Sequence, residues 1–276
     1  MRQEISNLNL ILYEYLFGIS HAFKFVEDSP FKIVPIWKTY KDIYLYLTGK
    51  TGDYLTSTSK MSNGSFGYSA SNCKAGGYLQ KIKNSICSLC YGMVGCYAFK
   101  NYITKSKRTV ESVSKEFWKE GMVFLINKKQ YKEFRWFDNG DLLSDKMLRD
   151  VFYIAEQTPD VKHWLPTKEY RMIRRVIESG LHKPDNLDIR LSAFKINGKP
   201  PMKLARRLGV NCSVSLTPKE FKKRINSLGG FKCHTAYSIK GKYKETNPEL
   251  YERLSSCSGC TACYNNKVDV IYYEVH

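Results

Sequence analysis

Three cysteines near the end of the chain have the spacing of a metal-binding motif. Cys257, Cys260 and Cys263 are each separated by two residues, and Cys233 lies upstream beside His234. The short turn between such residues brings their sulfurs to the same side, around one small centre. One C-x-x-C pair is typical of a zinc site, whereas three thiolates in series with a fourth favour a cubane iron–sulfur cluster. A four-cysteine zinc site, or His234 as a ligand, stays open as an alternative.

A second group of cysteines lies in the first half of the chain. Thirteen residues separate Cys73 from the C-x-x-C pair of Cys87 and Cys90, and Cys96 follows shortly after. Three thiolates would leave one iron of a cubane free to bind a small molecule, whereas a fourth from Cys96 would close it. We therefore predict one or two 4Fe-4S clusters. Cys96, like Cys212, is interpreted as a thiol of the hydrophobic core.

The cysteine count favours metal ligands over disulfides. Nine is an odd number, the chain is long, and the cysteines cluster as C-x-x-C. Thiolate ligands require a reducing compartment, and in the C-terminal cysteine group the neighbouring lysines and the positive field of the protein are expected to favour ionised thiolates. Residues 8–23 are apolar but include Glu14 and His21, are too short to span a membrane and lack a signal-peptide cleavage site. They are predicted as a packed helix, and the protein as soluble and cytoplasmic.

The net charge of +18, from 44 Lys+Arg against 26 Asp+Glu, predicts a polyanionic partner. Phosphate backbones are the commonest polyanions in a cell, so we expect contact with nucleic acid and not with a membrane. The basic stretches 203–207 and 219–244 are candidate contact surfaces. Aromatic residues that could stack on bases are interleaved in the second stretch: Phe221, Phe231, Tyr237 and Tyr243.

Strand and helix patterns alternate along residues 134–273. Short β-type runs are followed by segments with helical apolar spacing. Gly180 and Gly209 are predicted to end two helices, and Thr217 to Glu220 begins another with a capping box. This alternation is typical of βαβ units and predicts a full or partial (β/α) barrel with parallel strands, with an open doubly wound sheet as the alternative. The predicted strands are 134–137, 161–165, 187–191, 210–216 and 270–273.

Polar side chains follow several of these strands. The loops beyond the carboxyl ends of parallel strands converge where α/β proteins bind ligands. We predict catalytic roles for Asp138, Asp141, Lys168 and Glu169, and cofactor-binding roles for Asn139, Thr167 and Ser192. In the structural alternative, Asp141 and Glu169 stabilise helix N-termini and Thr217 is a helix cap. No Walker A loop, nucleophile elbow, H-E-x-x-H or G-x-G-x-x-G motif occurs, which disfavours those enzyme classes.

The remaining segments carry less pattern. Residues 1–50 are predicted as a helical N-terminal extension, residues 51–77 as a loop rich in Gly, Ser and Asn, and residues 109–125 as a helix. With 276 residues, of which 43% are hydrophobic, the chain can bury a full core. The predicted organisation is therefore an extension, 1–50, and a single metal-binding α/β domain, 51–276, that ends in a cysteine-rich segment.

Several of these motifs, in their order, resemble those of the gene product 88 family of bacteriophage proteins. They are Ser59 to Met61, Cys73 to Gly76, Ser85 to Tyr91, Phe134 to Asp141, His163 to Glu169, Cys257 to Tyr264 and the final His276. The resemblance covers the chain from about residue 50 to its end. It implies a phage or prophage origin, and hence a bacterial host cell, and a metal-bound α/β fold.

The family is also distantly similar to radical S-adenosylmethionine enzymes, which have a C-x-x-C-Tyr element near the start of a barrel. In those enzymes an open iron binds S-adenosylmethionine, so the resemblance implies this molecule as a further cofactor. The chain departs from their usual C-x-x-x-C-x-x-C motif, because thirteen residues lie between Cys73 and Cys87.

Two functions from different classes follow. The first is an iron–sulfur enzyme on a (β/α) scaffold that acts on nucleic acid or another phosphorylated substrate, with its cofactor at Cys73, Cys87 and Cys90. The second is a metal-stabilised binding protein without turnover, which contacts nucleic acid or a host factor through its positive surface.

Overall fold

An eight-stranded, mostly parallel sheet forms the centre of the protein. The computed structural model describes residues 22–25, 33–58, 61–257 and 259–275. The strands of the sheet are β3 (Thr56–Thr58), β4 (Met61–Phe66), β5 (Glu133–Trp136), β6 (Lys162–Thr167), β7 (Leu187–Ser192), β8 (Asn211–Leu216), β9 (Phe231–Lys232) and β10 (Val270–Glu274). Their order is β3-β4-β5-β6-β7-β8-β10-β9, with β3 antiparallel to β4 and all other neighbours parallel. The predicted α/β class with parallel strands is confirmed.

The sheet is open within the described ranges, because no pairing joins β3 to β9 there. From β4 to β8 the strand order follows the chain order, whereas in a doubly wound sheet the order reverses near the middle. The strands predicted from the sequence coincide with β5, β6, β7, β8 and β10. The described strands therefore form an open sheet, and they do not close into the full barrel that was one form of the prediction.

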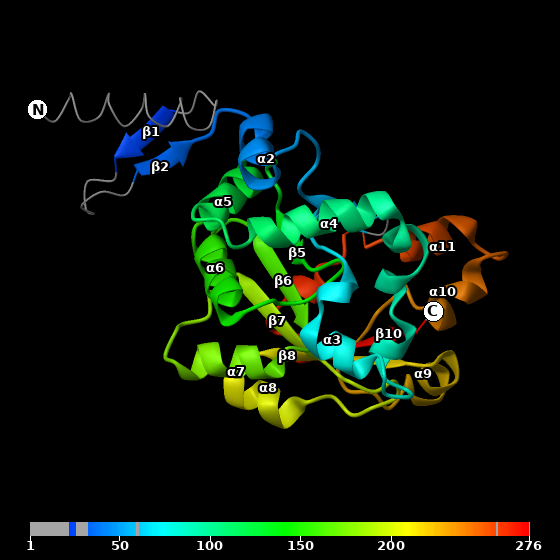
Figure 1. Ribbon diagram of the computed structural model, residues 1–276. Helices are drawn as coiled ribbons and strands as arrows, with labels where there is room; N and C mark the ends of the chain where they lie inside the picture. Colours follow the sequence, from blue (N-terminus) through cyan, green and yellow to red (C-terminus); the bar gives the residue numbers. More distant parts are fainter. Residues whose placement is uncertain (1–21, 26–32, 59–60, 258, 276) are drawn as a thin grey trace, which may run out of the picture.

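Helices that connect the parallel strands form one layer. They are α5 (Trp118–Lys128), α6 (Asp145–Glu156), α7 (Tyr170–Glu178) and α8 (Met202–Leu208), and each contacts the next (Figure 1). Right-handed crossovers between strands in chain order place successive helices on the same side of a sheet. Gly209 ends α8 as predicted, with φ of 61°, a conformation that glycine adopts without a Cβ clash.

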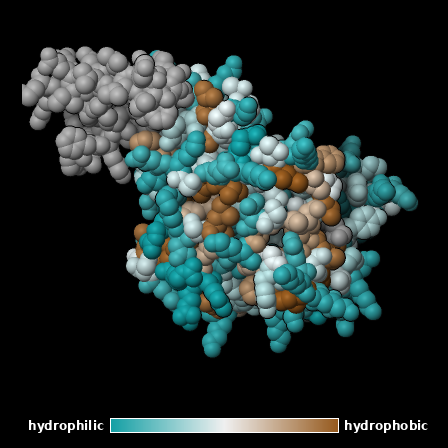
Figure 2. Space-filling model, viewed as in Figure 1, coloured by the Kyte–Doolittle hydropathy of each residue, from teal (hydrophilic) through white to brown (hydrophobic). Residues whose placement is uncertain are grey.

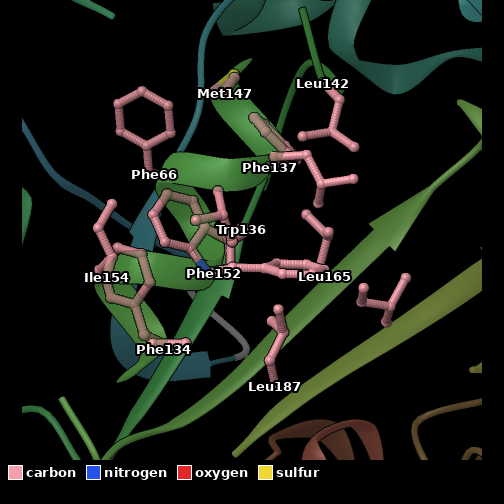
Figure 3. Close-up of a cluster of buried hydrophobic side chains, with 14 of the residues drawn as sticks. Phe66, Phe134, Trp136, Phe137, Leu142, Met147, Phe152, Ile154, Leu165 and Leu187 are labelled. Carbon is pink, nitrogen blue, oxygen red and sulfur yellow. The ribbon is translucent and has the colours of Figure 1, made fainter. Parts of the chain in front are cut away.

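Alternate residues of each strand face this helical layer and form the core. Phe134 and Trp136 of β5 and Leu165 of β6 are fully buried there with Phe152 and Ile154 of α6 (Figure 3). The period of two means that the residues between them face the opposite side of the sheet.

Two segments far apart in sequence lie on that opposite side. The first contains η1 (Ala70–Asn72), α3 (Lys74–Leu79), η2 (Ile86–Leu89), η3 (Tyr91–Met93) and η4 (Gly95–Ala98), and leads into α4 (Lys100–Ser112). The second follows α9 (Pro218–Arg224) and contains α10 (Tyr237–Lys240), η5 (Gly241–Tyr243), α11 (Pro248–Ser255) and η6 (Ala262–Tyr264). Because each segment carries one cysteine group, the fold brings the two groups to the same side of the sheet.

Two predictions for the first half of the chain are wrong. The helix expected at 109–125 is divided into α4 and α5, because the Oγ of Ser112 and of Ser114 donate to Thr109 O and Glu111 O and compete with the helical bonds. The loop expected at 51–77 contains β3, β4 and η1. In β4, pairing with a strand on each side outweighs the poor strand propensity of Asn and Gly.

The N-terminal part also differs from the expected helix. Residues 22–25 and 33–36 form an antiparallel pair, β1 (Ala22–Phe25) and β2 (Ile33–Ile36), and the rest of the helix predicted from Leu8 lies outside the described residues. α2 (Tyr40–Thr48) lies beside α5, and its Ile43 and Leu47 are buried in the same core as the sheet. The boundary predicted at residue 50 thus falls inside one packed unit. None of the described helices is long and apolar enough to cross a membrane.

Candidate functional site: a cysteine-lined cavity

A cavity of about 610 Å³ lies at the carboxyl ends of the parallel strands. Strand residues that face away from the helical layer form part of its wall, among them Arg135, Trp164, Pro166, Ser213 and Tyr273. Six cysteines also line it: Cys73, Cys87 and Cys90 from the first segment, and Cys233, Cys257 and Cys263 from the second. The fold therefore brings members of both predicted ligand groups to one cavity.

Cys73, Cys87 and Cys90 lie in or beside the short helices α3 and η2. Cys73 immediately precedes α3, Cys87 lies in η2, and Cys90 follows η2. A Cβ on Gly76 would lie 2.8 Å from the Cβ of Cys73, 3.6 Å from its Sγ and 3.8 Å from the Sγ of Cys87. Both sulfurs are therefore within 4 Å of one point, and glycine leaves the space beside them free.

Burial keeps these thiols protonated. Desolvation raises the pKa of Cys73 and of Cys87 above the ordinary thiol value, and the positive charge of Lys168 lowers it by less. Desolvation and nearby negative groups outweigh the effect of the lysine on the pKa of both thiols. Binding of a metal ion or cluster at this group has to release protons.

The second cysteine group is held by hydrogen bonds and apolar packing. The Sγ of Cys263 lies 3.2 Å from Tyr273 Oη, and burial raises the pKa of this thiol to about 12. The Sγ of Cys233 lies 3.2 Å from Thr235 Oγ1. Cys257 and Cys263 pack against an apolar cluster of Met61, Trp164 and Tyr264.

The other cysteines lie elsewhere. Cys260 lines a separate hollow, together with His234. Cys212 is fully buried in the core, as predicted. Cys96 is exposed, so its interpretation as a core thiol is wrong, since η4 lies at the surface and its neighbours Gly95 and Ala98 are exposed as well.

The cavity thiols share a wall without surrounding a single ion. Within the described ranges, no group of three His, Cys, Asp or Glu side chains is close enough to hold one metal ion. The described cysteines form no disulfide with one another.

A buried arginine holds the second cysteine segment against the sheet. Arg190 of β7 is fully buried and forms a 2.5 Å ion pair with Asp188. Its guanidinium also donates to the carbonyl oxygens of Ala262 at 3.1 Å and Val268 at 2.8 Å. Because a buried cation needs charge and hydrogen-bond partners, these contacts fix the loop that carries Cys263.

Asp141 connects the loop after β5 to the end of β6. Its Oδ1 accepts hydrogen bonds from Thr167 Oγ1 at 2.6 Å and from the backbone N–H of Leu142 at 2.8 Å. Its Oδ2 accepts from the backbone N–H of Lys168 at 2.8 Å. Burial raises the pKa of Asp141, and these hydrogen bonds oppose that shift. The contacts make Asp141 a positioning residue.

Asp138 has an unpartnered oxygen in the wall of the cavity. The side chain is buried, and its Oδ1 has no hydrogen-bond partner among the described residues. Burial raises its pKa, and the nearby Arg135 opposes this shift. The amide of Asn139 is occupied differently, since it donates to Tyr102 Oη at 3.0 Å and accepts from the Gly140 N–H at 2.9 Å. Asp138 is thus the acidic side chain with capacity left for a ligand.

The remaining predicted residues divide between the cavity and the scaffold. Those that line the cavity are Thr167, Lys168 and Ser192. Glu169 does not line it, because its Oε1 accepts from the Ala75 N–H at 2.7 Å and so holds the first turn of α3, next to Cys73. Thr217 caps α9 as predicted and accepts from the Glu220 N–H at 3.4 Å.

Arg135, Trp164 and Tyr91 are cavity residues that the sequence analysis did not identify. The guanidinium carbon of Arg135 lies 4.8 Å from the centroid of the Trp164 ring, and its Nη2 donates to Tyr91 Oη at 3.4 Å. Tyr91 Oη donates in turn to the carbonyl oxygen of Asp138. Strand alternation contained the signal, because an arginine between two aromatic core residues of β5 must face the opposite side.

Fold and cavity together define an α/β protein with a mostly parallel sheet and cysteines from two segments at the carboxyl ends of its strands. Residues 45–266 match the family described as gene product 88, so the chain belongs to that family. No curated protein and no solved structure matches the chain. The family resemblance noted from the motifs is thereby confirmed.

Proposed function

We propose that this protein is a phage-encoded iron–sulfur protein whose cavity holds at least one 4Fe-4S cluster. The supporting observation is that six cysteines from two distant segments line one cavity at the carboxyl ends of parallel strands. This end of the sheet is where α/β enzymes bind substrates and cofactors. Membership of a gene product 88 family supports a phage or prophage origin, and hence a place in the cytoplasm of a bacterial host.

The first cysteine group fits a three-ligand cluster. Cys73, Cys87 and Cys90 would be its ligands, and the glycine at position 76 leaves space beside the sulfurs of Cys73 and Cys87. A cubane distributes its thiolates over separate irons, so its ligands need not meet at one ion. The chain-ordered strands β4 to β8 also support a partial-barrel scaffold similar to that of radical S-adenosylmethionine enzymes.

A three-ligand cluster would supply an electron and an open iron to a small molecule such as S-adenosylmethionine. The chain's own residues would bind and orient that ligand and the substrate. Asp138 offers its unpartnered oxygen, Lys168 offers a cation and Ser192 a hydroxyl, while Asn139 and Thr167 line the wall with polar groups that already have hydrogen-bond partners. The volume of about 610 Å³ is ordinary for a cofactor or substrate site. The reaction we propose is on nucleic acid or another phosphorylated substrate.

The second cysteine group would hold either a second cluster or a structural zinc ion. Arg190 fixes the loop of Cys263 through a buried ion pair and backbone carbonyls, which is typical of a rigid structural site. This observation favours the alternative function, a metal-stabilised binding protein without turnover. Cys260 and His234 would need to turn from their own hollow to join Cys233 and Cys257.

Anaerobic reconstitution with iron and sulfide tests the proposal. We expect a brown protein with broad visible absorbance and about four irons and four sulfides for each cluster. The triple variant Cys73→Ser/Cys87→Ser/Cys90→Ser should lose one cluster, whereas Cys96→Ser should retain it, because Cys96 is exposed and outside the cavity. Reductive cleavage of S-adenosylmethionine by the loaded protein would establish the enzyme.

Two results would contradict the proposal. One is a colourless protein with stoichiometric zinc and no bound sulfide, which would establish the alternative. The other is equal iron content in the triple variant and in Cys96→Ser, which would show that Cys73, Cys87 and Cys90 are not the ligands.

A further inference from the structure

Exposed apolar side chains gather in the first cysteine segment. Tyr78 is 70% exposed and Phe99 is 66% exposed. The same segment also exposes Leu89, Tyr91, Met93, Val94 and Ile103. Figure 2 shows hydrophobic side chains interspersed with hydrophilic ones on the face that carries α3 and α4. Exposed apolar groups in this number mark an interaction surface.

Exposed aromatic residues from three parts of the chain lie in the cavity lining or next to it in sequence. Tyr91 lines the cavity and is 55% exposed. Phe194 and Tyr237 are exposed as well, and each directly follows an alanine that lines the cavity. Tyr91 therefore lines the cavity with part of its surface free, and Phe194 and Tyr237 are exposed next to lining residues, with Phe194 stacked on one side against Tyr170.

The charge of the same segment has one sign. Between Asp53 and Glu111 the sequence has no acidic residue. The exposed basic residues of this stretch are Lys74, Lys81, Lys83, Lys100 and Lys107. Ion pairs between described residues lie outside this stretch. By contrast, Arg207 on α8 pairs with Glu178 at 3.1 Å, so part of the positive charge predicted at 203–207 is neutralised.

We propose that the exposed residues of 74–108, with Phe194 and Tyr237, bind single-stranded nucleic acid. We call these residues the rim surface. Its lysines would contact phosphates while unpaired bases stack on its rings and a nucleotide enters the cavity. Stacking requires an open base face, which a duplex hides, so the rings favour single strands. Phe221 of the stretch first predicted is fully buried and cannot stack.

This inference rests on the proposed function only for the chemistry that follows binding. Binding itself uses side chains outside the cysteine groups, so it can be measured with and without reconstitution. If the protein binds nucleic acid but takes up no cluster on reconstitution, only the proposed function is contradicted. Loss of binding with an intact cluster would contradict the rim surface alone.

Fluorescence anisotropy with labelled oligothymidylate, oligouridylate and a DNA duplex tests the rim surface in the full chain. We expect tighter binding of a single strand than of the duplex. Tyr78→Ala with Phe99→Ala should weaken single-strand binding about fivefold or more, since stacked bases lose their partners. The matched control Leu45→Ala removes an exposed apolar side chain of α2, outside the rim surface, and should leave binding unchanged.

Charge variants give a second, independent measurement. Lys81→Glu with Lys83→Glu should reduce the slope of log affinity against log salt by about 1.4, because two phosphate contacts are lost. The control pair Lys203→Glu with Arg206→Glu, on α8, should leave the slope unchanged. Three results overturn the proposal: absence of oligonucleotide binding, equal affinity for duplex with no effect of the ring variants, or an equal effect of the α8 pair. Displacement of the oligonucleotide by polyglutamate at equal concentration would also overturn it, in favour of an acidic protein partner.

Discussion

The thiols of Cys73 and Cys87 illustrate how position overrides composition at single residues. A net charge of +18 favours anionic groups in general, yet burial raises the pKa of both thiols. Asp141 adds to the shift at Cys73, although 67 positions separate them in sequence. The sequence identified Asp141 as a residue at the end of a strand. The sequence alone does not show that Asp141 lies near Cys73, because this proximity arises from the position of α3, which Glu169 holds, in the folded chain.

His163 is a buried histidine that its contacts hold neutral. Trp136 Nε1 donates to its Nδ1 at 3.3 Å, and its Nε2 lies 2.8 Å from Thr158 Oγ1. Burial lowers the pKa of His163 to about 3. An unfolded histidine has a pKa of about 6.5, so the folded state binds fewer protons between these values. Its contribution to stability is complete above about pH 6.5 and is lost progressively as the pH falls toward 3.

The expected loss from pH 7 to pH 5 is about 2 kcal/mol in the free energy of unfolding. Urea unfolding of the natural chain and of His163→Gln at both pH values measures it. The variant does not titrate at this position, so its stability should fall by about 2 kcal/mol less. Equal losses in the two proteins would contradict the assignment of a neutral core histidine.

Arg190 is a single residue on which a whole segment depends. Arg190→Leu leaves the carboxylate of Asp188 buried without its cation, which should cost about 3–5 kcal/mol of unfolding free energy. Replacing both by leucine should recover part of that loss. The exposed pair of Arg174 and Glu178 is the control, since Arg174→Ala should cost less than about 1 kcal/mol. Urea unfolding compares the variants. An equal loss of unfolding free energy in Arg190→Leu and Arg174→Ala would contradict the role of Arg190 in holding the second cysteine segment.

At the scale of elements, α3 places the first cysteine group through one close approach. A Cβ at Gly76 would lie 2.8 Å from the Cβ of Cys73, whereas nothing lies within 4 Å of a Cβ at Gly77. Gly76→Ala should therefore displace Cys73 and lower the iron content after reconstitution severalfold. Gly77→Ala should retain the iron and add about 0.5–1 kcal/mol of stability, because alanine favours the helix.

Iron analysis and thermal unfolding of the two glycine variants check this pair. The rate at which Cys73 reacts with a thiol reagent gives a measurement that does not depend on the cluster. Unchanged iron and unchanged thiol reactivity in Gly76→Ala would show that α3 does not constrain the cysteine.

The elements from β5 to α9, and β10, were predictable because each strand and helix repeats the same pattern of apolar spacing, whereas β9, α10 and α11 were not predicted. Ser144 and Thr217 cap α6 and α9, and Gly209 ends α8, all through local chemistry that the sequence states directly. The earlier elements were not predictable in this way. β4 contains Asn and Gly and is a strand because partners lie on both sides of it, which is information from outside the segment.

At the scale of the whole molecule, α2 belongs to the core of the sheet domain. Ile43 is fully buried, and a Cβ at Gly121 of α5 would lie 2.8 Å from its Cδ1. Ile43→Ala should destabilise the whole chain by about 2–5 kcal/mol, because it leaves a cavity between two helices. Leu45→Ala on the exposed side of α2 should change stability by less than about 0.5 kcal/mol. A single urea transition shifted only by Ile43→Ala is the expected result, and equal shifts would remove α2 from the core.

The candidate site was partly predictable at this scale. Most of the residues identified from strand ends and cysteine spacing do line the cavity. These patterns did not show that the two cysteine groups share it, since this depends on two covering segments that meet across the sheet. The aromatic residues of the rim surface were not predictable either, because the exposure of Tyr78 and Phe99 depends on how the whole chain packs.

The position of β10 has a consequence for the order in which the chain folds during synthesis on the ribosome. In the described sheet, β9 pairs only with β10, and β10 pairs with β8. β10 is therefore inserted between two strands that precede it in the chain, and β9, which leads to Cys233, has no strand partner until β10 has been synthesised. Cys73, Cys87 and Cys90, by contrast, leave the exit tunnel well before β10 is synthesised.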